Sequence, residues 1–259
     1  SALKLHGTLK DFSLFASHDG QHYALKGDFE QIANTDPSLL PGFQGLSGHI
    51  SGNQTQGQIV LDTHDAEVNA QHYLREVLKI THLGARINWL QTAEQWQINS
   101  NDLHLNTPDF KTKSHFDLSI PKNAQSPILH LDTALSSFND IAKIKNYLPS
   151  KLMGQDAVAW LDDAFVAGHI DQGQILVNGP LDQFPFKHGG GVFDALLGIQ
   201  EGEIQFNEVW PHLQNLYTTV HFLNSDLQVA IYNGHSENVQ INQAIINIED
   251  VANSDHVQV

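Results

Sequence analysis

Apolar and polar residues alternate along most of this chain. Clear examples are Phe116-Asp117-Leu118-Ser119-Ile120, Leu103-His104-Leu105 and Leu227-Gln228-Val229-Ala230-Ile231. Because successive side chains of a β-strand point to opposite faces of the sheet, this period of two predicts strands with one apolar and one polar face. The sequence therefore predicts an all-β protein whose function depends on what the apolar face covers.

Turn-forming residues divide the pattern into about eighteen short strands. Asn224-Ser225 is expected to form a hairpin turn, and the polar run 99–102 is expected to form another. On the same grounds we predict separate strands on either side of each short break, as at 57–63 and 66–70. Consecutive antiparallel hairpins follow from this arrangement.

Helical periodicity is limited to three short segments. The strongest is 156–165, with Asp156 as the expected N-cap, followed by 139–147 with Asn139 as the cap and a weaker segment at 73–77. These helices are too few to cover the apolar faces of so many strands. A sandwich, a closed barrel and an open curved gutter all remain compatible with the periodicity.

Composition and charge exclude several classes of protein. The 259 residues include no cysteine, which excludes disulfide frameworks, thiolate metal sites and cysteine nucleophiles. A formal net charge of −16 argues against nucleic acid and anionic lipid surfaces as partners. No apolar run is long enough to span a bilayer, and the chain starts and stops inside alternating sequence, so we expect an internal piece of a longer protein.

Motifs for catalysis, cofactors or metals are weak. Asp162 and Asp163 are adjacent and would point about 100° apart on a helix, which makes them a poor acid–base pair. The glycine run after His188 lacks the Lys and Ser/Thr of a phosphate loop, and the sixteen His form no HExxH or His-x-His motif. We therefore expect no enzyme activity, no cofactor and no metal site.

The two halves of the chain share three short similar segments. Segments 37–40, 46–50 and 57–61 are followed in the same order by 149–152, 166–170 and 173–177. This order indicates duplication. The chain is thus expected to be one continuous β segment, residues 1–259, with two tandem subrepeats, 1–136 and 137–259, as a possible subdivision.

Several blocks in the second half resemble the YhdP branch of the AsmA-like proteins in both order and spacing. They are Tyr147-Leu148-Pro149, Ala159-Trp160-Leu161-Asp162-Asp163-Ala164-Phe165, Gly168-His169-Ile170, Gly179-Pro180-Leu181-Asp182-Gln183-Phe184-Pro185-Phe186, Gly191-Val192-Phe193, Trp210-Pro211-His212-Leu213 and Phe222-Leu223-Asn224 with Leu227. The first 140 residues resemble this branch more loosely, through 46–48, 84–89 and Trp96.

The resemblance implies a fold and a function. The fold would be a long curved antiparallel sheet that forms an open, taco-shaped gutter with an apolar lining and a few short helices. The chain would be a segment of a protein of the Gram-negative envelope, anchored in the inner membrane and reaching across the periplasm to the outer membrane. Its groove would shield the acyl chains of phospholipid, its expected partner, during transfer.

With this fold, the alternation assigns individual residues to the groove. The expected lining residues are Ile59, Leu61, Ile87, Trp89, Leu103, Leu105, Phe116, Leu118, Ile120, Leu129, Leu131, Ile175, Val177, Ile204, Phe206, Val220, Phe222, Leu227, Val229 and Ile231. The candidates for a rim or gate are Trp160, Phe184, Phe186 and Trp210. For each of these residues, the alternative role is ordinary core packing.

A different class of function fits the same pattern. A closed β domain could serve as a spacer or docking module of the envelope, with its apolar face packed entirely against itself. The two functions differ in whether the apolar face is left open, and the three-dimensional structure decides that point.

Overall fold

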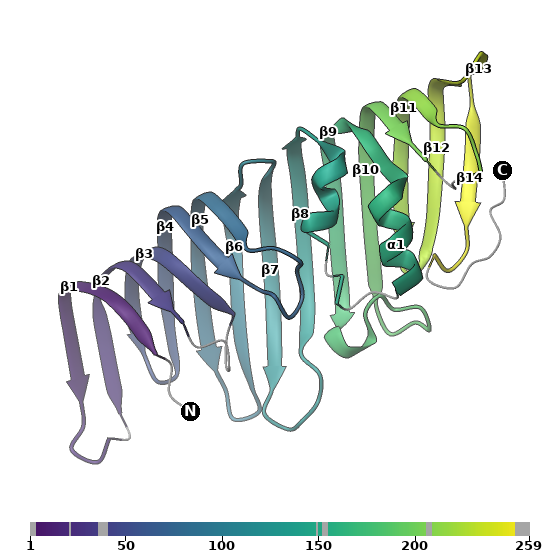
Figure 1. The fold of residues 1–259 in the computed structure, drawn as a ribbon. Helices are drawn as coiled ribbons and strands as arrows, with labels where there is room; N and C mark the ends of the chain where they lie inside the picture. The colour runs from purple at the N-terminus through teal and green to yellow at the C-terminus, as the bar shows by residue number, and fades with distance from the viewer. Residues whose placement is uncertain are drawn as a thin grey trace.

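The computed structural model describes residues 4–20, 22–35, 41–148, 150–151, 155–205 and 209–251, with only the backbone of 156–157. They form one antiparallel sheet of 14 strands in which β1 to β13 lie in chain order and β14 pairs with β12. The sheet curves and does not close on itself (Figure 1). The predicted all-β fold with an open gutter is confirmed, and the sandwich and the barrel are excluded.

Most strands follow one another through hairpins, but a longer segment separates β8 from β9, and β13 and β14 both pair with β12. The bounds of the strands are β1 Leu5–Ala16, β2 Tyr23–Asn34, β3 Gly42–Asn53, β4 Gln56–Asn69, β5 Leu78–Gln91, β6 Gln95–Asn106, β7 Lys111–Pro121, β8 Ile128–Phe138, β9 Phe165–Pro180, β10 Val192–Ile204, β11 Leu213–Leu223, β12 Asp226–Ser236, β13 Val239–Ile241 and β14 Ala244–Ile248.

Most strands are longer than the sequence predicts because several predicted breaks are β-bulges. The expected turn at 99–102 is wrong: β6 continues through it, with a register shift against β7 between Ser100 and Leu103. The expected break at 64–65 likewise lies inside β4, where Asp65 has a φ of 55°. The predicted hairpin at Asn224-Ser225 is confirmed between β11 and β12.

The bulges of neighbouring strands lie side by side and bend the sheet. A Cβ on Gly7 would lie 2.9 Å from the Gln31 carbonyl oxygen, so the two strands pass very close together here. The Gln31 amide donates to Ser47 Oγ at 3.0 Å. A Cβ on Gly45 would lie 3.0 Å from the Asp65 carbonyl oxygen. Because a bulge inserts an unpaired residue and bends its strand, this row folds β1 to β4 along one line.

A second row of bulges crosses β9 to β11. Gly168, Glu201 and Asn215 have φ angles of 123°, 51° and 51°. A Cβ on Gly168 would lie 2.8 Å from Gly202 Cα, so the chains pass too closely here for a side chain. We call each of the two rows a crease. Together they turn a flat sheet into a gutter.

The helices are short and lie between β8 and β9, apart from a single turn, η2 (Leu181–Gln183). A 3₁₀ helix, η1 (Ile141–Asn146), is capped by Asp140, which accepts the Ala142 amide at 3.2 Å; the predicted cap Asn139 is wrong by one residue. The helix α1 (Gln155–Ala164) ends one residue before the prediction, since Phe165 begins β9. The predicted helix at 73–77 is wrong, because 71–73 form a turn and 75–76 a bend.

The segments that suggested duplication occupy different parts of the sheet. In the first half, 46–50 lies on β3 and 57–61 on β4, whereas in the second half 166–170 and 173–177 both lie on β9. The earlier pair, 37–40 and 149–152, includes residues outside the described ones. The division into subrepeats 1–136 and 137–259 stays a prediction.

Candidate functional site

The strand register places the predicted lining on one face of the sheet. Directly paired residues in an antiparallel sheet point to the same side. Leu118 pairs with Leu129 on β8 and with Ile98 on β6, and Ile98 pairs in turn with Trp89 on β5. We call the side that carries these residues the groove face.

The same face continues in both directions along the sheet. Towards the N-terminus Ile87 pairs with Ile59, and Ile59 pairs with Ile50 on β3. Towards the C-terminus the series runs through Leu131 and Val177 of β8 and β9. Val220 and Val229 pair across β11 and β12 and belong to this face. Ile50 and Ile98 were missed from the sequence, although Ile98 lies in the alternating run Trp96-Gln97-Ile98.

The degree of burial divides the predicted lining into two groups, which follow the chain. The half-buried group is Ile59, Leu61, Ile87, Trp89, Leu103, Leu105, Phe116, Leu118, Ile120, Leu129, Leu131, Ile175 and Phe222. The buried group is Val177, Ile204, Val220, Leu227, Val229 and Ile231, each with 8% exposure or less. Phe206 lies outside the described residues.

The segment between β8 and β9, residues 139–164, accounts for this difference. We call it the insert, and its helices lie on one side of the sheet (Figure 1). Ile141, Leu161 and Ala164 of the insert are 0%, 5% and 0% exposed, and they belong to one buried cluster with residues of β8 to β12 and β14. Protein side chains thus fill the groove in the C-terminal half.

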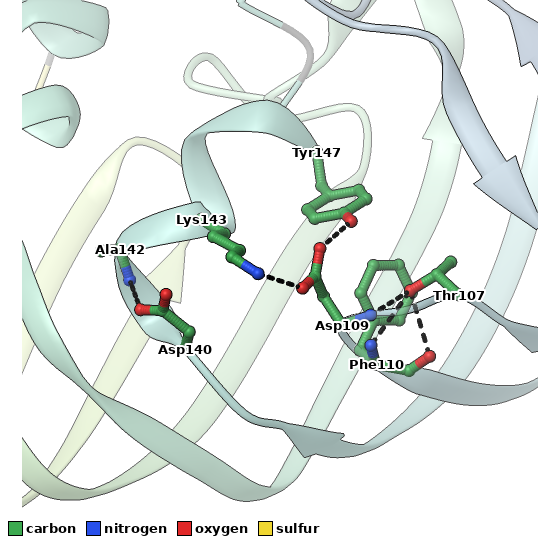
Figure 2. A network of polar contacts seen from close by, with 7 residues as sticks. All are labelled: Thr107, Asp109, Phe110, Asp140, Ala142, Lys143 and Tyr147. Atoms are coloured by element: carbon green, nitrogen blue, oxygen red, sulfur yellow. Dashed lines mark hydrogen bonds and ion pairs between the residues drawn. The ribbon is translucent and has the colours of Figure 1, made fainter.

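A polar and aromatic contact fixes the insert to the turn between β6 and β7 (Figure 2). Lys143 Nζ and the Tyr147 hydroxyl donate to the two carboxylate oxygens of Asp109, at 2.7 Å and 2.5 Å. The Tyr147 ring stands edge-on to Phe110 and Phe138, with centroids 4.8 Å and 5.8 Å away. We call this contact the latch.

The latch shifts the pKa values of its members. Burial raises the pKa of Asp109, but the hydrogen bonds from Lys143 and Tyr147 outweigh it and hold that pKa below its usual range. Burial and the hydrogen bond to Asp109 raise the pKa of Tyr147 to about 12. The latch therefore favours an ionised Asp109, which accepts both hydrogen bonds, and a neutral Tyr147, which donates one of them.

Next to the β3–β4 hairpin, the Trp89 side chain on the groove face lies against glycine backbone. A Cβ on Gly57 would be closer to Trp89 Cζ2 than van der Waals contact allows, and one on Gly52 would lie 2.6 Å from the same atom. The two glycines therefore leave the space that the indole of Trp89 occupies. Around it is a shallow depression of about 410 Å³ at the β3–β4 hairpin.

The candidate rim residues pack mainly against protein. Phe186, 1% exposed, lies over the backbone of the β9–β10 hairpin, where a Cβ on Gly191 would be closer than van der Waals contact allows. Phe184 contacts Phe193 with centroids 5.1 Å apart, and Trp160 on α1 stands edge-on to Phe165. Trp210 is 43% exposed. A role for any of them as a gate stays a prediction.

Comparison with known proteins places this sheet in a family. The chain is 28% identical over 189 residues, 73% of its length, to the intermembrane phospholipid transporter YhdP of Escherichia coli (strain K12), and it spans 15% of the length of that relative. No solved structure matches. The family model described as YhdP protein matches residues 1–259 in full. With an open sheet, an apolar groove face and this match over the whole chain, the protein belongs to the YhdP family.

Proposed function

We propose that this chain is a segment of a lipid-transfer protein that shields phospholipid acyl chains on the groove face of β3 to β8. The observation that carries the proposal is the half-buried state of thirteen predicted lining residues, eleven of which lie on β4 to β8. A single curved layer presents them, with no second sheet over them in the described ranges. A sheet that folds only to bury its apolar face has no reason to leave so much of it half-covered.

The open part of the groove is long enough for an acyl chain. Six neighbouring strands at a spacing of about 4.8 Å extend over about 24 Å across the sheet. The hydrocarbon layer of one leaflet is about 15 Å thick, half of a bilayer core of about 30 Å. An acyl chain that lies across the strands would therefore contact several of them at once.

The proposed role of the groove is to lower a barrier. Each buried CH₂ contributes about 0.8 kcal/mol, so an acyl chain of about sixteen carbons would cost on the order of 10 kcal/mol to expose to water. Contact with the groove face would replace water along the side of the acyl chain that it covers. Because lipid would leave one apolar environment for another, the groove by itself gives no direction to the movement.

The location follows from the relative and is part of the proposal. The similar protein is named an intermembrane phospholipid transporter. We therefore place this segment in the periplasm, within a longer protein anchored in the inner membrane and reaching the outer membrane. No helix in the described ranges has the length and apolarity to cross a bilayer. No step of this transfer requires a catalytic residue.

Site-specific photocrosslinking to lipid tests the proposal. A photoreactive side chain replaces Leu118 on the groove face, and a matched variant carries it at Ser119, the next residue on the opposite face. After incubation with phosphatidylethanolamine vesicles and irradiation, mass spectrometry of the purified chain should detect a lipid adduct at position 118 and at most a trace at 119.

If the chain is a closed structural module, no selective lipid adduct at position 118 is expected. Equal labelling at both positions, or no adduct at 118 together with a purified protein free of lipid by native mass spectrometry, would contradict the proposal. It would then leave a spacer or docking role for this segment. The open sheet does not favour that role.

A further inference from the structure

Two histidines and one aspartate meet on the face opposite the groove. Asp62 and His64 lie on β4 and His82 on β5, and His64 pairs directly with His82 in the register. Leu61 lies on the groove face, so Asp62 and His64 project from the other side of β4. All three side chains are accessible to solvent, the centroids of the two imidazole rings lie 4.7 Å apart, and the carboxylate of Asp62 lies beside them, closer to His82 than to His64.

The distances are those of a small metal site. His82 Nε2 lies 3.3 Å and His64 Nδ1 3.9 Å from Asp62 Oδ1, and one possible ligand atom from each residue lies within 4.8 Å of the others. Ligand atoms at 2.0–2.1 Å from a tetrahedral zinc ion are about 3.3 Å apart. The carboxylate and His82 already have this separation, and small rotations would bring in His64.

The His82 ring lies beside Gly84, which pairs with Asp62 on the neighbouring strand. A Cβ on Gly84 would lie at ordinary van der Waals distance from two atoms of the ring, 3.4 Å and 3.8 Å away. The crease at Asp65 follows His64 directly on β4, and the pairing of β4 with β5 continues past the cluster without a register shift.

The chemistry of the donors selects the kind of ligand. Neutral imidazole nitrogens and a carboxylate oxygen suit zinc and neighbouring first-row divalent ions, and three protein ligands leave one position for water. The net charge of −16 favours the approach of cations. We propose that Asp62, His64 and His82 bind one divalent metal ion, zinc or a similar first-row ion, on the outer face of β4 and β5.

Sequence inspection could not find this cluster. His64 and His82 are 18 positions apart, outside the spacing of the helical and zinc-finger motifs, and only the pairing of β4 with β5 places them opposite each other. The proposal concerns binding and is independent of lipid transfer. It predicts that the ion ties β4 to β5 next to the crease.

Titration of the whole chain with Zn²⁺ tests the proposal. Isothermal calorimetry should show one tight site per chain, and the affinity should fall at least about tenfold in His64→Ala and in His82→Ala, because each removes a ligand. The control is His49→Ala. His49 on β3 contacts Asp28 on β2 at 2.6 Å. Among the described residues this pair belongs to no group of three possible metal ligands, so loss of His49 should leave the affinity unchanged.

A second measurement uses the unmodified chain, so its result does not depend on whether the variants fold. In the unmodified chain one equivalent of Zn²⁺ should shift the imidazole resonances of His64 and His82 before those of the other fourteen histidines. Binding of equal strength in the double variant His64→Ala/His82→Ala, or early shifts at other histidines only, would show adventitious binding and overturn the proposal.

Discussion

The two halves of the sheet have the same pattern of alternating residues and different coverage. On β4 to β8 the eleven predicted lining residues are half-buried, whereas on β10 to β12 the groove-face residues are almost all buried, most of them in one cluster with the insert. Both halves contain a crease. The difference teaches that alternation determines which side of a strand is apolar, while a segment elsewhere in the chain determines whether that side is open.

The latch lies at the boundary between the two halves. Asp109 belongs to the turn between β6 and β7, in the open half, and its partners Lys143 and Tyr147 belong to the insert. The stacked pair Phe110 and Phe138 adds an apolar contact at the same place. Two sets of contacts thus hold the insert in place. One is the latch to the β6–β7 turn in the open half, and the other is the buried cluster in the C-terminal half.

Val229→Asp should have the largest effect on stability. Val229 is 1% exposed inside the cluster, so the variant would bury a carboxylate without a partner and lose at least about 4 kcal/mol of unfolding free energy. Urea denaturation followed by circular dichroism measures the loss. The control Gln228→Asp changes the neighbouring residue on the opposite face and should cost less than about 1 kcal/mol. A similar loss in both variants would contradict a filled C-terminal half.

Leu161→Ala examines the insert itself. Leu161 is 5% exposed on α1, and a large-to-small change in such a core costs about 2 to 5 kcal/mol. Thermal unfolding against the exposed control Asp163→Ala, expected within about 0.5 kcal/mol of the unmodified chain, measures the difference. If Leu161→Ala has no larger effect than its control, the insert does not stabilise the C-terminal half.

Leu118→Asp should separate lipid binding from stability in the open half. Because Leu118 is half-buried, a charge there keeps contact with water and should cost about 1 kcal/mol of unfolding free energy. Binding of a fluorescent phospholipid should weaken about tenfold, since an acyl chain on the groove face would then have to desolvate a carboxylate. Ser119→Asp should leave lipid binding unchanged. Strong unfolding of Leu118→Asp would instead indicate that the two halves are equally closed.

Tyr147→Phe should have the smallest effect and a defined pH dependence. Loss of the hydroxyl removes the hydrogen bond to Asp109 and should cost about 1 kcal/mol near pH 7. The pKa of Tyr147 is raised from 10.0 to about 12 on folding, so its contribution is complete below pH 10 and is lost as pH rises through 12. Unfolding between pH 8 and 12 should therefore depend less on pH in Tyr147→Phe. Parallel pH profiles would contradict a hydrogen bond that raises the pKa of Tyr147 in the folded chain.

The sequence predicted which residues share a face, and it did so because the β-strand period is a local property. Leu118 and Leu129 were both assigned to the groove from alternation, and they pair directly across β7 and β8. Breaks in the pattern were harder to interpret. The polar run at 99–102 contains turn-forming residues, but the parts of β6 on either side of it both pair with β7. Only this long-range pairing distinguishes a bulge from a hairpin turn.

The coverage of the groove could not be predicted from the pattern. The helix at Trp160 has an apolar stripe, which indicates that it packs on something without showing where. Its position depends on contacts with β8 to β12 that are distant in the chain. The residues of the latch had no signal of their own, since Asp109, Lys143 and Tyr147 become neighbours only when the insert packs back on the turn between β6 and β7.

The two creases have a geometric consequence. Because each bent strand contributes to both walls of the gutter, the width of the trough is determined by how many residues lie on either side of the bulge. The length of the trough across the strands is determined separately by the number of hairpins, each of which adds about 9.6 Å. Copying hairpins would thus lengthen such a trough without altering its cross-section.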